Sequence, residues 1–312
     1  MRITDKVDRT QQRSKPAGVA VATFKKFSED RSTNLASMIA FWGIFSIFPL
    51  FMVLVTVLAW VLPASDRQSV FGHVAKMLPL LDPSTVSGLT GSTLALVFGL
   101  LTALWSGLGV VRTTQFAFDS VWEIPYHERP GMMQQTLRSV WVLGTIGVGL
   151  VLTTLISGFV VTSANGVHLG AIGRAGGYVL AAALDVGIFL AAFRILTTRV
   201  NTMREVLPGA LLAGVAFFIL QQVSALIISH YLHKAQSTYG HFATVITILW
   251  WFYLQAIITL LGAQLNVVLK EHLFPRSLVD APQTPADHRV LEAYAGERTY
   301  HPRQRVTTRV ER

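Results

Sequence analysis

Six long apolar runs constrain this chain more than any other feature. A helix needs about 20 apolar residues to cross the hydrocarbon core of a bilayer. A soluble domain has about a quarter of its residues charged, but here 52% are hydrophobic and only 14% are charged. We therefore predict an all-α, polytopic membrane protein with six transmembrane helices, at about residues 37–62, 92–111, 139–161, 177–196, 207–229 and 243–269.

The distribution of basic residues predicts the orientation. Of the 26 Lys and Arg residues, 22 lie in or beside the N-terminal segment, the second and fourth loops and the C-terminal tail. Cytoplasmic segments of membrane proteins carry such an excess, so both termini are expected in the cytoplasm. The formal net charge of +9 then reflects topology rather than nucleic-acid binding, because the basic residues are not interleaved with an aromatic platform.

Three parts are expected along the chain. Residues 1–36 form a cytoplasmic segment, and its stretch "GVAVATFKKF", residues 18–27, is a candidate interfacial helix, because an apolar stripe accompanies Lys25 and Lys26. Residues 37–270 form the transmembrane domain. Within it, residues 112–138 are expected to include a short helix parallel to the membrane. Residues 271–312 form a basic tail whose polar composition predicts disorder.

Polar side chains at membrane depth are the candidate functional residues. Asp185 is the only carboxylate inside the six runs, and a charged Asp there costs about 2.5–3.5 kcal/mol on insertion scales. It should face the bundle interior, pair with a cation or be protonated. Gln221, Gln222 and Gln255 lie at similar depth in the following two runs. Two interpretations stay open: a polar path through the last three helices, or hydrogen bonds between helices worth about 1 kcal/mol each.

Small residues and a proline predict details of helix packing. Gly209 and Ala213 form a small-xxx-small pair that lets two backbones approach closely. In the last run Gly262 and Asn266 share one stripe, while Gln264 points elsewhere, and we expect Gly262 and Asn266 to form a close helix contact. Pro49 predicts a kink in the first helix.

Signatures of enzymes are missing from the sequence. The chain has no cysteine, and it contains no HExxH, GxSxG or P-loop motif. His230 and His233 stand three residues apart near His241, without an acidic residue in the short loop, which favours an interfacial cluster over a metal site. We expect no catalytic residue, no cofactor and no metal.

Several motifs together resemble a known family, the YihY/BrkB membrane proteins. The stretch "NLASMIAFWGIFSIFPLFMVL" includes Ser46 and Pro49, and "LPGALLAGV" includes Pro208 and Gly209. The closing stretch "YGHFATVITILWWFYLQAIITLLGAQLN" supplies Tyr239, Gly240, Gly262, Gln264 and Asn266. Two positions depart from the family pattern: Gln264 stands where Glu is usual, and Asp119 where Asn is common.

The resemblance implies a bacterial inner-membrane protein with six membrane-spanning helices. The family was once labelled ribonuclease BN, a label now regarded as mistaken, and it has been linked with serum resistance and envelope lipid export. The expected function is transport or translocation of a lipid or small solute. The alternative is a non-transporting scaffold for envelope assembly. Expected partners are membrane lipids, with envelope proteins or a second copy as candidates, and no nucleic acid.

Overall fold

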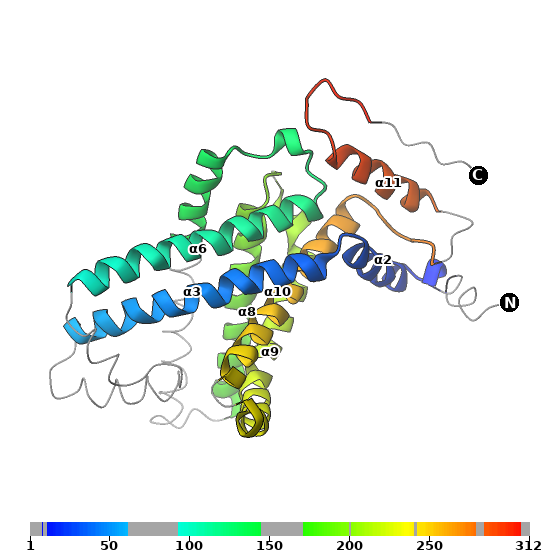
Figure 1. The fold of residues 1–312 in the computed structure, drawn as a ribbon. Coiled ribbons are helices and arrows are strands. Elements are labelled where there is room, and N and C mark those ends of the chain that lie inside the picture. Colours follow the sequence, from blue (N-terminus) through cyan, green and yellow to red (C-terminus); the bar gives the residue numbers. More distant parts are fainter. Residues whose placement is uncertain are drawn as a thin grey trace. The chain divides into compact units, whose positions relative to one another are not determined.

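Helices make up all the regular structure of the described residues. The computed structural model describes residues 8, 11–61, 93–144, 171–199, 201–239, 242–278 and 284–306, and these ranges contain no strand. The expected all-α class is confirmed there. A further helical stretch covers residues 132–144. The elements are α2 (Lys15–Glu29), α3 (Ser32–Val61), α6 (Thr93–Val121), η1 (Tyr126–Glu128), α8 (Ala171–Leu196), α9 (Met203–Tyr239), α10 (Phe242–Lys270) and α11 (Pro285–Glu297) (Figure 1).

Within the described residues, four helices are long and apolar enough to cross a membrane. They match the second, fourth, fifth and sixth predicted runs, and their apolar segments are Val97–Val121, Gly176–Leu196, Met203–Gln221 and Val245–Lys270. A shorter apolar stretch, Ser32–Ile47, lies in α3 and belongs to the first run. Only residues 139–144 of the third run lie within the described ranges. The count of six membrane-spanning helices therefore stays a prediction.

The chain forms two compact units. Unit 1 comprises Met1–Ala36, Thr114–Leu220 and Ile257–Arg312, and unit 2 comprises Ser37–Thr113 and Gln221–Ala256. The borders fall inside α6, α9 and α10 and near the start of α3. The predicted transmembrane domain, 37–270, is thus shared between both units.

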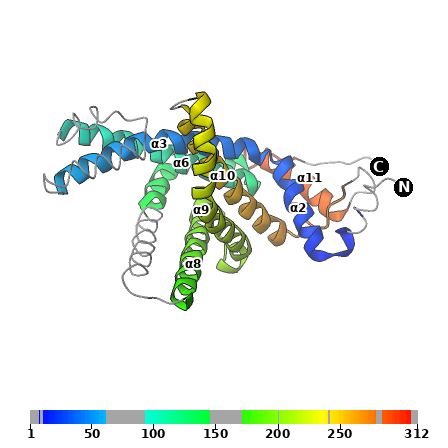
Figure 2. The ribbon, with the colours of Figure 1, turned by 90° about the horizontal axis from the view of Figure 1, so that it is seen from below.

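In unit 1, α8, α9 and the second half of α10 pack through small residues. The helices α8 and α9 lie side by side (Figure 2), and a methyl group added to Gly214 of α9 would be 2.6 Å from Cγ2 of Val186. Gly262 of α10 faces the ring of Phe193, 2.9 Å from the position of such a methyl group, and Phe193 itself is buried. The backbones approach this closely because glycine has no side chain to separate them.

In unit 2, α3 packs against α6 and the first half of α10. Trp42 lies over Gly109 of α6 and makes an edge contact with Trp105, with ring centroids 5.4 Å apart. On the neighbouring face, the ring of Phe252 would be 3.0 Å from a methyl group at Gly43. Large aromatic rings on one helix thus fill the space left by glycine on the other.

The segment after α6 differs in part from the expected interfacial helix. Helix α6 continues to Val121, and only the short turn η1 follows before the helical stretch 132–144. Prolines at positions 125 and 130 flank η1, and proline favours an extended conformation of the residue before it, so the helix cannot continue there.

The tail contains a helix where disorder was expected. The hydroxyl of Thr284 accepts a hydrogen bond from the backbone N–H of Asp287 (3.3 Å), and the Asp287 carboxylate accepts one from the backbone N–H of Thr284 (2.9 Å). This capping box satisfies two donors that a helix start leaves free, and Pro285 occupies the first turn of α11. Ala286 and Val290 are buried. Local capping and burial therefore order residues that the polar composition assigned to a disordered tail.

Candidate functional site

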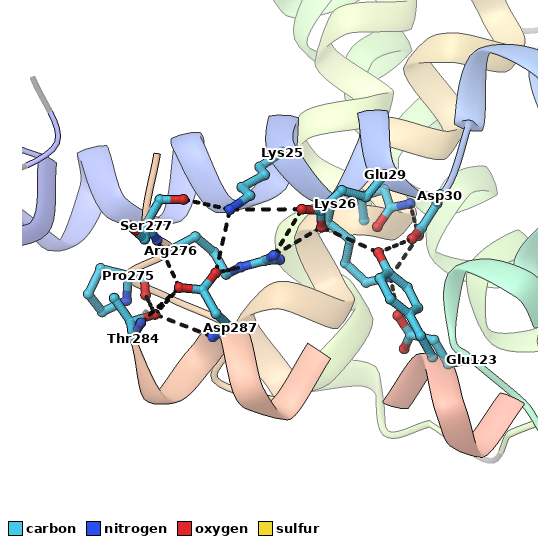
Figure 3. A network of polar contacts seen from close by, with 12 residues as sticks. Lys25, Lys26, Glu29, Asp30, Glu123, Pro275, Arg276, Ser277, Thr284 and Asp287 are labelled. Carbon is cyan, nitrogen blue, oxygen red and sulfur yellow. Dashed lines mark hydrogen bonds and ion pairs between the residues drawn. The ribbon is translucent and has the colours of Figure 1, made fainter. Parts of the chain in front are cut away.

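A fully buried cation, Lys26, lies at the centre of a polar cluster in unit 1. Its Nζ atom forms an ion pair with Asp30 at 2.6 Å, a second ion pair with Glu123, and a hydrogen bond to the Val121 carbonyl oxygen at 3.1 Å (Figure 3). The Lys26 side chain is 0% exposed. The stretch 18–27 lies within α2 and its role as an interfacial helix stays a prediction, but Lys26 itself is buried inside unit 1. The reason is that two carboxylates compensate the loss of hydration.

Two further helices, α10 and α11, close the cluster around Asp30. The Gln264 amide of α10 donates to Oδ2 of Asp30 at 2.6 Å and to the Ser32 hydroxyl at 3.1 Å. The Tyr294 hydroxyl of α11 donates to Oδ1 of Asp30 at 2.6 Å. The Tyr294 ring also lies 5.5 Å from Nζ of Lys26, within the range of a cation–π contact. We call Lys26, Asp30, Glu123, Gln264 and Tyr294 the Lys26 cluster.

Burial changes the proton affinities in the Lys26 cluster. Burial raises the pKa of Glu123 to about 7, since the loss of hydration outweighs the attraction of Lys26. Burial lowers the pKa of Lys26, but the Glu123 and Asp30 carboxylates outweigh it, and the net shift is upward. Burial and the Asp30 carboxylate also raise the pKa of Tyr294. The cluster therefore exchanges a proton near neutral pH at Glu123, while Lys26 stays charged and Tyr294 stays a neutral donor.

A second polar cluster fastens the segment before α11 to α2 (Figure 3). The nearly buried Arg276 donates from Nε to Asp287 at 2.6 Å and from Nη2 to both carboxylate oxygens of Glu29 at 3.0 Å. Lys25 lies 3.5 Å from Asp287 and donates to the Ser277 carbonyl oxygen at 2.5 Å. Burial raises the pKa of Asp287, but hydrogen bonds from Arg276, Thr284 and Ser277 outweigh the effect of burial. The pKa of Asp287 is therefore held below its usual range.

The candidate polar path is divided between the units. Asp185 lies on α8 in unit 1 and is 4% exposed. Gln221 and Gln255 belong to unit 2, and the side chain of Gln222 lies outside the described residues. A path through these four residues stays a prediction.

Three motif residues meet where α9 and α10 cross in unit 1. The side-chain oxygen of Asn266 accepts a hydrogen bond from the backbone N–H of Gly209 at 2.6 Å. A methyl group on Gly262 would be 2.7 Å from the Gly209 carbonyl oxygen. Pro208 precedes this contact within α9. The amide in this part of α10 thus serves helix packing, as does that of Gln264 in the Lys26 cluster.

The other motif residues lie elsewhere. Ser46 is buried in unit 2 and donates to the Gly43 carbonyl oxygen at 2.7 Å, and Pro49 lies within α3. Tyr239 ends α9, but its side chain, like Gly240, is outside the described residues.

Asp119, noted above as a departure from the family pattern, and Arg138 hold the end of α8. Asp119 accepts hydrogen bonds from the backbone N–H of Thr198 at 3.0 Å and from its hydroxyl at 2.9 Å. Arg138 donates to the Ile195 carbonyl oxygen at 2.7 Å, so a cation satisfies acceptors at the C-terminal end of the helix. These contacts join positions far apart in sequence, so no local sequence pattern predicts them.

An apolar groove of about 610 Å³ opens between α2 and the pair α9 and α10. Lys15 supplies the one charged side chain among its lining residues, and the Thr23 hydroxyl is satisfied by the Val19 carbonyl oxygen at 2.8 Å. From α2 the groove is lined by Lys15, Pro16, Val19, Ala20, Thr23 and Phe24, and from α9, α10 and the segment that follows by Leu212, Ala216, Ile258, Leu261, Leu265, Leu269 and Phe274.

Comparison with known proteins assigns the chain to a family. The family described as Virulence factor BrkB matches residues 23–287. The chain belongs to this family. The resemblance seen in the motifs is thereby confirmed. Relatives named as membrane proteins and the four described helices of membrane-crossing length together make this a membrane protein.

Three relatives illustrate the similarity. A Bacillus subtilis protein named putative ribonuclease-like protein YfkH is 26% identical over 79% of this chain and 93% of its own length. A membrane protein named UPF0761 PSHAa0171, from Pseudoalteromonas translucida, is 28% identical over 65% of this chain and 66% of its own. A UPF0761 membrane protein of Pseudoalteromonas atlantica is 23% identical over 82% of this chain and 90% of its own. No solved structure matches.

Proposed function

We propose that this BrkB-family protein moves a lipid across the bacterial cytoplasmic membrane, which it crosses six times with both termini inside. The observation that carries the proposal is the apolar groove between α2 and the helices α9 and α10. A small solute is the second choice of cargo, because a polar solute finds few partners on a surface lined almost entirely by hydrocarbon.

The helices that form the floor of the groove favour a lipid acyl chain as its occupant. Leu212 and Ala216 lie within Met203–Gln221, and Leu261 and Leu265 within Val245–Lys270, two segments of membrane-crossing length. In the proposed arrangement the groove opens to the hydrocarbon region, where acyl chains are the available apolar ligand. Lys15 at the start of α2 is suited to attract a lipid phosphate, because cations near the membrane surface bind anionic headgroups.

Asp185 is the proposed coupling residue. It is buried on a helix of membrane-crossing length, and an ionisable side chain at that depth marks an ion or proton route in many transporters. Together with Gln221, Gln222 and Gln255 it would line the polar path for a headgroup or proton. We assign no catalytic residue, no cofactor and no nucleic-acid partner.

A non-transporting scaffold for envelope assembly is the second candidate. It is favoured by the hydrogen bonds of Gln264 to Asp30 and of Asn266 to Gly209, which use conspicuous amides for internal packing. Under this reading Asp185 is structural, and the Asp185→Asn variant keeps full function as long as it folds. The partners would be envelope proteins or a second copy of the chain.

The test is translocation of fluorescent lipid across proteoliposomes that contain the full-length protein. We compare the wild type with Ala216→Trp, which fills the groove, and with Asp185→Asn. Leu211→Trp is the matched control, since Leu211 is exposed on α9 but does not line the groove. Transport that is lost in Ala216→Trp and kept in Leu211→Trp, at equal incorporation, supports the proposal. Absence of lipid movement in the wild type, with and without a proton gradient, would overturn it and favour the scaffold.

A further inference from the structure

A second cavity, of about 430 Å³, lies in unit 1 beside the Lys26 cluster. It differs from the apolar groove because charged and polar side chains line much of it. We propose that this cavity binds a phosphate group, and specifically the headgroup phosphate of an anionic phospholipid. The inference does not depend on transport. The lining residues are Glu29, Asp30, Arg31, Leu35, Phe116, Ser120, Tyr294, Glu297 and Arg298.

Each of the three carboxylates of the cavity already has a neighbouring cation. Glu29 pairs with Arg276 at 3.0 Å, Asp30 with Lys26 at 2.6 Å, and Glu297 with Arg129 at 2.6 Å. Each of these three cations is nearly or fully buried beside its carboxylate, with 4%, 0% and 11% of its side chain exposed. The carboxylates are therefore held in place by ion pairs, although Lys26 also pairs with Glu123 and Arg276 also pairs with Asp287.

Two arginines remain. Within the described ranges, no acidic side chain forms an ion pair with Arg31 or Arg298. They come from different elements, Arg31 from the turn between α2 and α3 and Arg298 from the end of α11. The cavity thus combines paired carboxylates with two uncompensated guanidinium groups, and its preferred ligand is an anion.

The geometry of guanidinium groups favours phosphate over carboxylate. A guanidinium binds two oxygens in a planar fork, and a carboxylate has only two oxygens to share between two such forks. A phosphate has enough oxygens for Arg31, Arg298 and the hydroxyl of Ser120, which also lines the cavity. Two arginines and a hydroxyl on separate elements therefore match a phosphate.

The apolar residues of the cavity indicate where the phosphate comes from. Phe116 lies within Val97–Val121, near the end of a helix of membrane-crossing length, and Leu35 lies near the start of the apolar stretch Ser32–Ile47. The ends of such helices lie at the level of the lipid headgroups. A phospholipid could place its phosphate between the arginines and its glycerol and first methylenes against Leu35 and Phe116.

The test measures binding of phosphatidylglycerol to the delipidated full-length protein in detergent, with phosphatidylcholine for comparison. Native mass spectrometry counts the bound lipids, and thermal unfolding measures the stabilisation. We compare the wild type with Arg31→Gln and Arg298→Gln. The matched control is Arg303→Gln, an exposed arginine of the same tail that does not line the cavity. Each cavity variant is expected to bind phosphatidylglycerol about tenfold more weakly, because a charge-assisted hydrogen bond contributes about that much.

Each outcome decides a part of the proposal. Equal phosphatidylglycerol binding by wild type, Arg31→Gln and Arg298→Gln would overturn the site. Glycerol phosphate is the soluble probe: if it binds as tightly as the lipid, and the same two variants weaken it, the phosphate site stands but its lipid source is refuted. Arg31→Lys controls for misfolding, because it keeps the positive charge and loses only the planar fork of the guanidinium. Its affinity for phosphatidylglycerol should lie between that of the wild type and that of Arg31→Gln.

Discussion

The crossing of α9 and α10 allows a quantitative prediction for Gly209→Ala. The added methyl group would fall against the Gly262 carbonyl oxygen and 2.5–2.6 Å from the side-chain amide of Asn266. Backbone lies on one side of the new group, so the helices must move apart rather than one side chain turn. Such overpacking costs about 1–3 kcal/mol. The separation also stretches the hydrogen bond from Gly209 to Asn266, now 2.6 Å, which is worth about 0.5–1.5 kcal/mol.

The expected loss is therefore about 1.5–4.5 kcal/mol in the free energy of unfolding. Reversible unfolding in mixed micelles measures it, followed by tryptophan fluorescence. Gly187→Ala on α8 is the matched control, because among the described residues no atom lies within 4 Å of its added methyl group. That control should be neutral or more stable by up to about 1 kcal/mol, since alanine is the better helix former. Equal stability of the two variants would refute the reasoning that α9 and α10 meet backbone to backbone.

Three further predictions concern the Lys26 cluster and α11. Lys26→Met leaves Asp30 and Glu123 buried without their cation and should destabilise the protein by about 3–5 kcal/mol; Lys26→Met with Glu123→Gln should recover part of that loss in the same unfolding assay. The pKa of Glu123 is about 7, above its ordinary 4.5, so its contribution to stability is complete below pH 4.5 and is lost as the pH rises through 7. Wild type should therefore lose more stability than Glu123→Gln between those limits, and an equal slope would contradict the assignment. Thr284→Ala removes the cap of α11, costs about 0.5–2 kcal/mol locally, and should accelerate amide hydrogen exchange in α11 but not in α8.

Much of the helical architecture was predictable because it depends on local hydropathy. The second, fourth, fifth and sixth apolar runs all correspond to helices long enough to cross a membrane. The tail shows what hydropathy misses. Thr284, Pro285 and Asp287 form the sequence pattern of a helix start with a capping box. That pattern predicts α11 within a segment whose composition alone predicts disorder.

The polar clusters could be predicted only in part from the sequence. The spacing of Lys26 and Asp30, four residues apart on one helix, is a readable sign of an ion pair. Glu123 and Tyr294 could not be added to it, because their positions depend on how α6 and α11 pack against α2. Gln264 illustrates the same limit: its departure from the usual Glu was visible, but its reason was not. In the structure Gln264 donates to Asp30, whereas a glutamate would place a second carboxylate against the first.

The union of α2 with α11 has a consequence for the order in which the protein matures. Tyr294 and Asp30 are 264 residues apart in the chain, and translation proceeds from the N-terminus at about 5–20 residues per second. Tyr294 is therefore synthesised at least about ten seconds after Asp30, while the intervening helices are already entering the membrane. Helix α11 is therefore the last element added to the cluster. A chain whose synthesis ends before residue 285 would contain the membrane helices, but its charged centre would stay open to water.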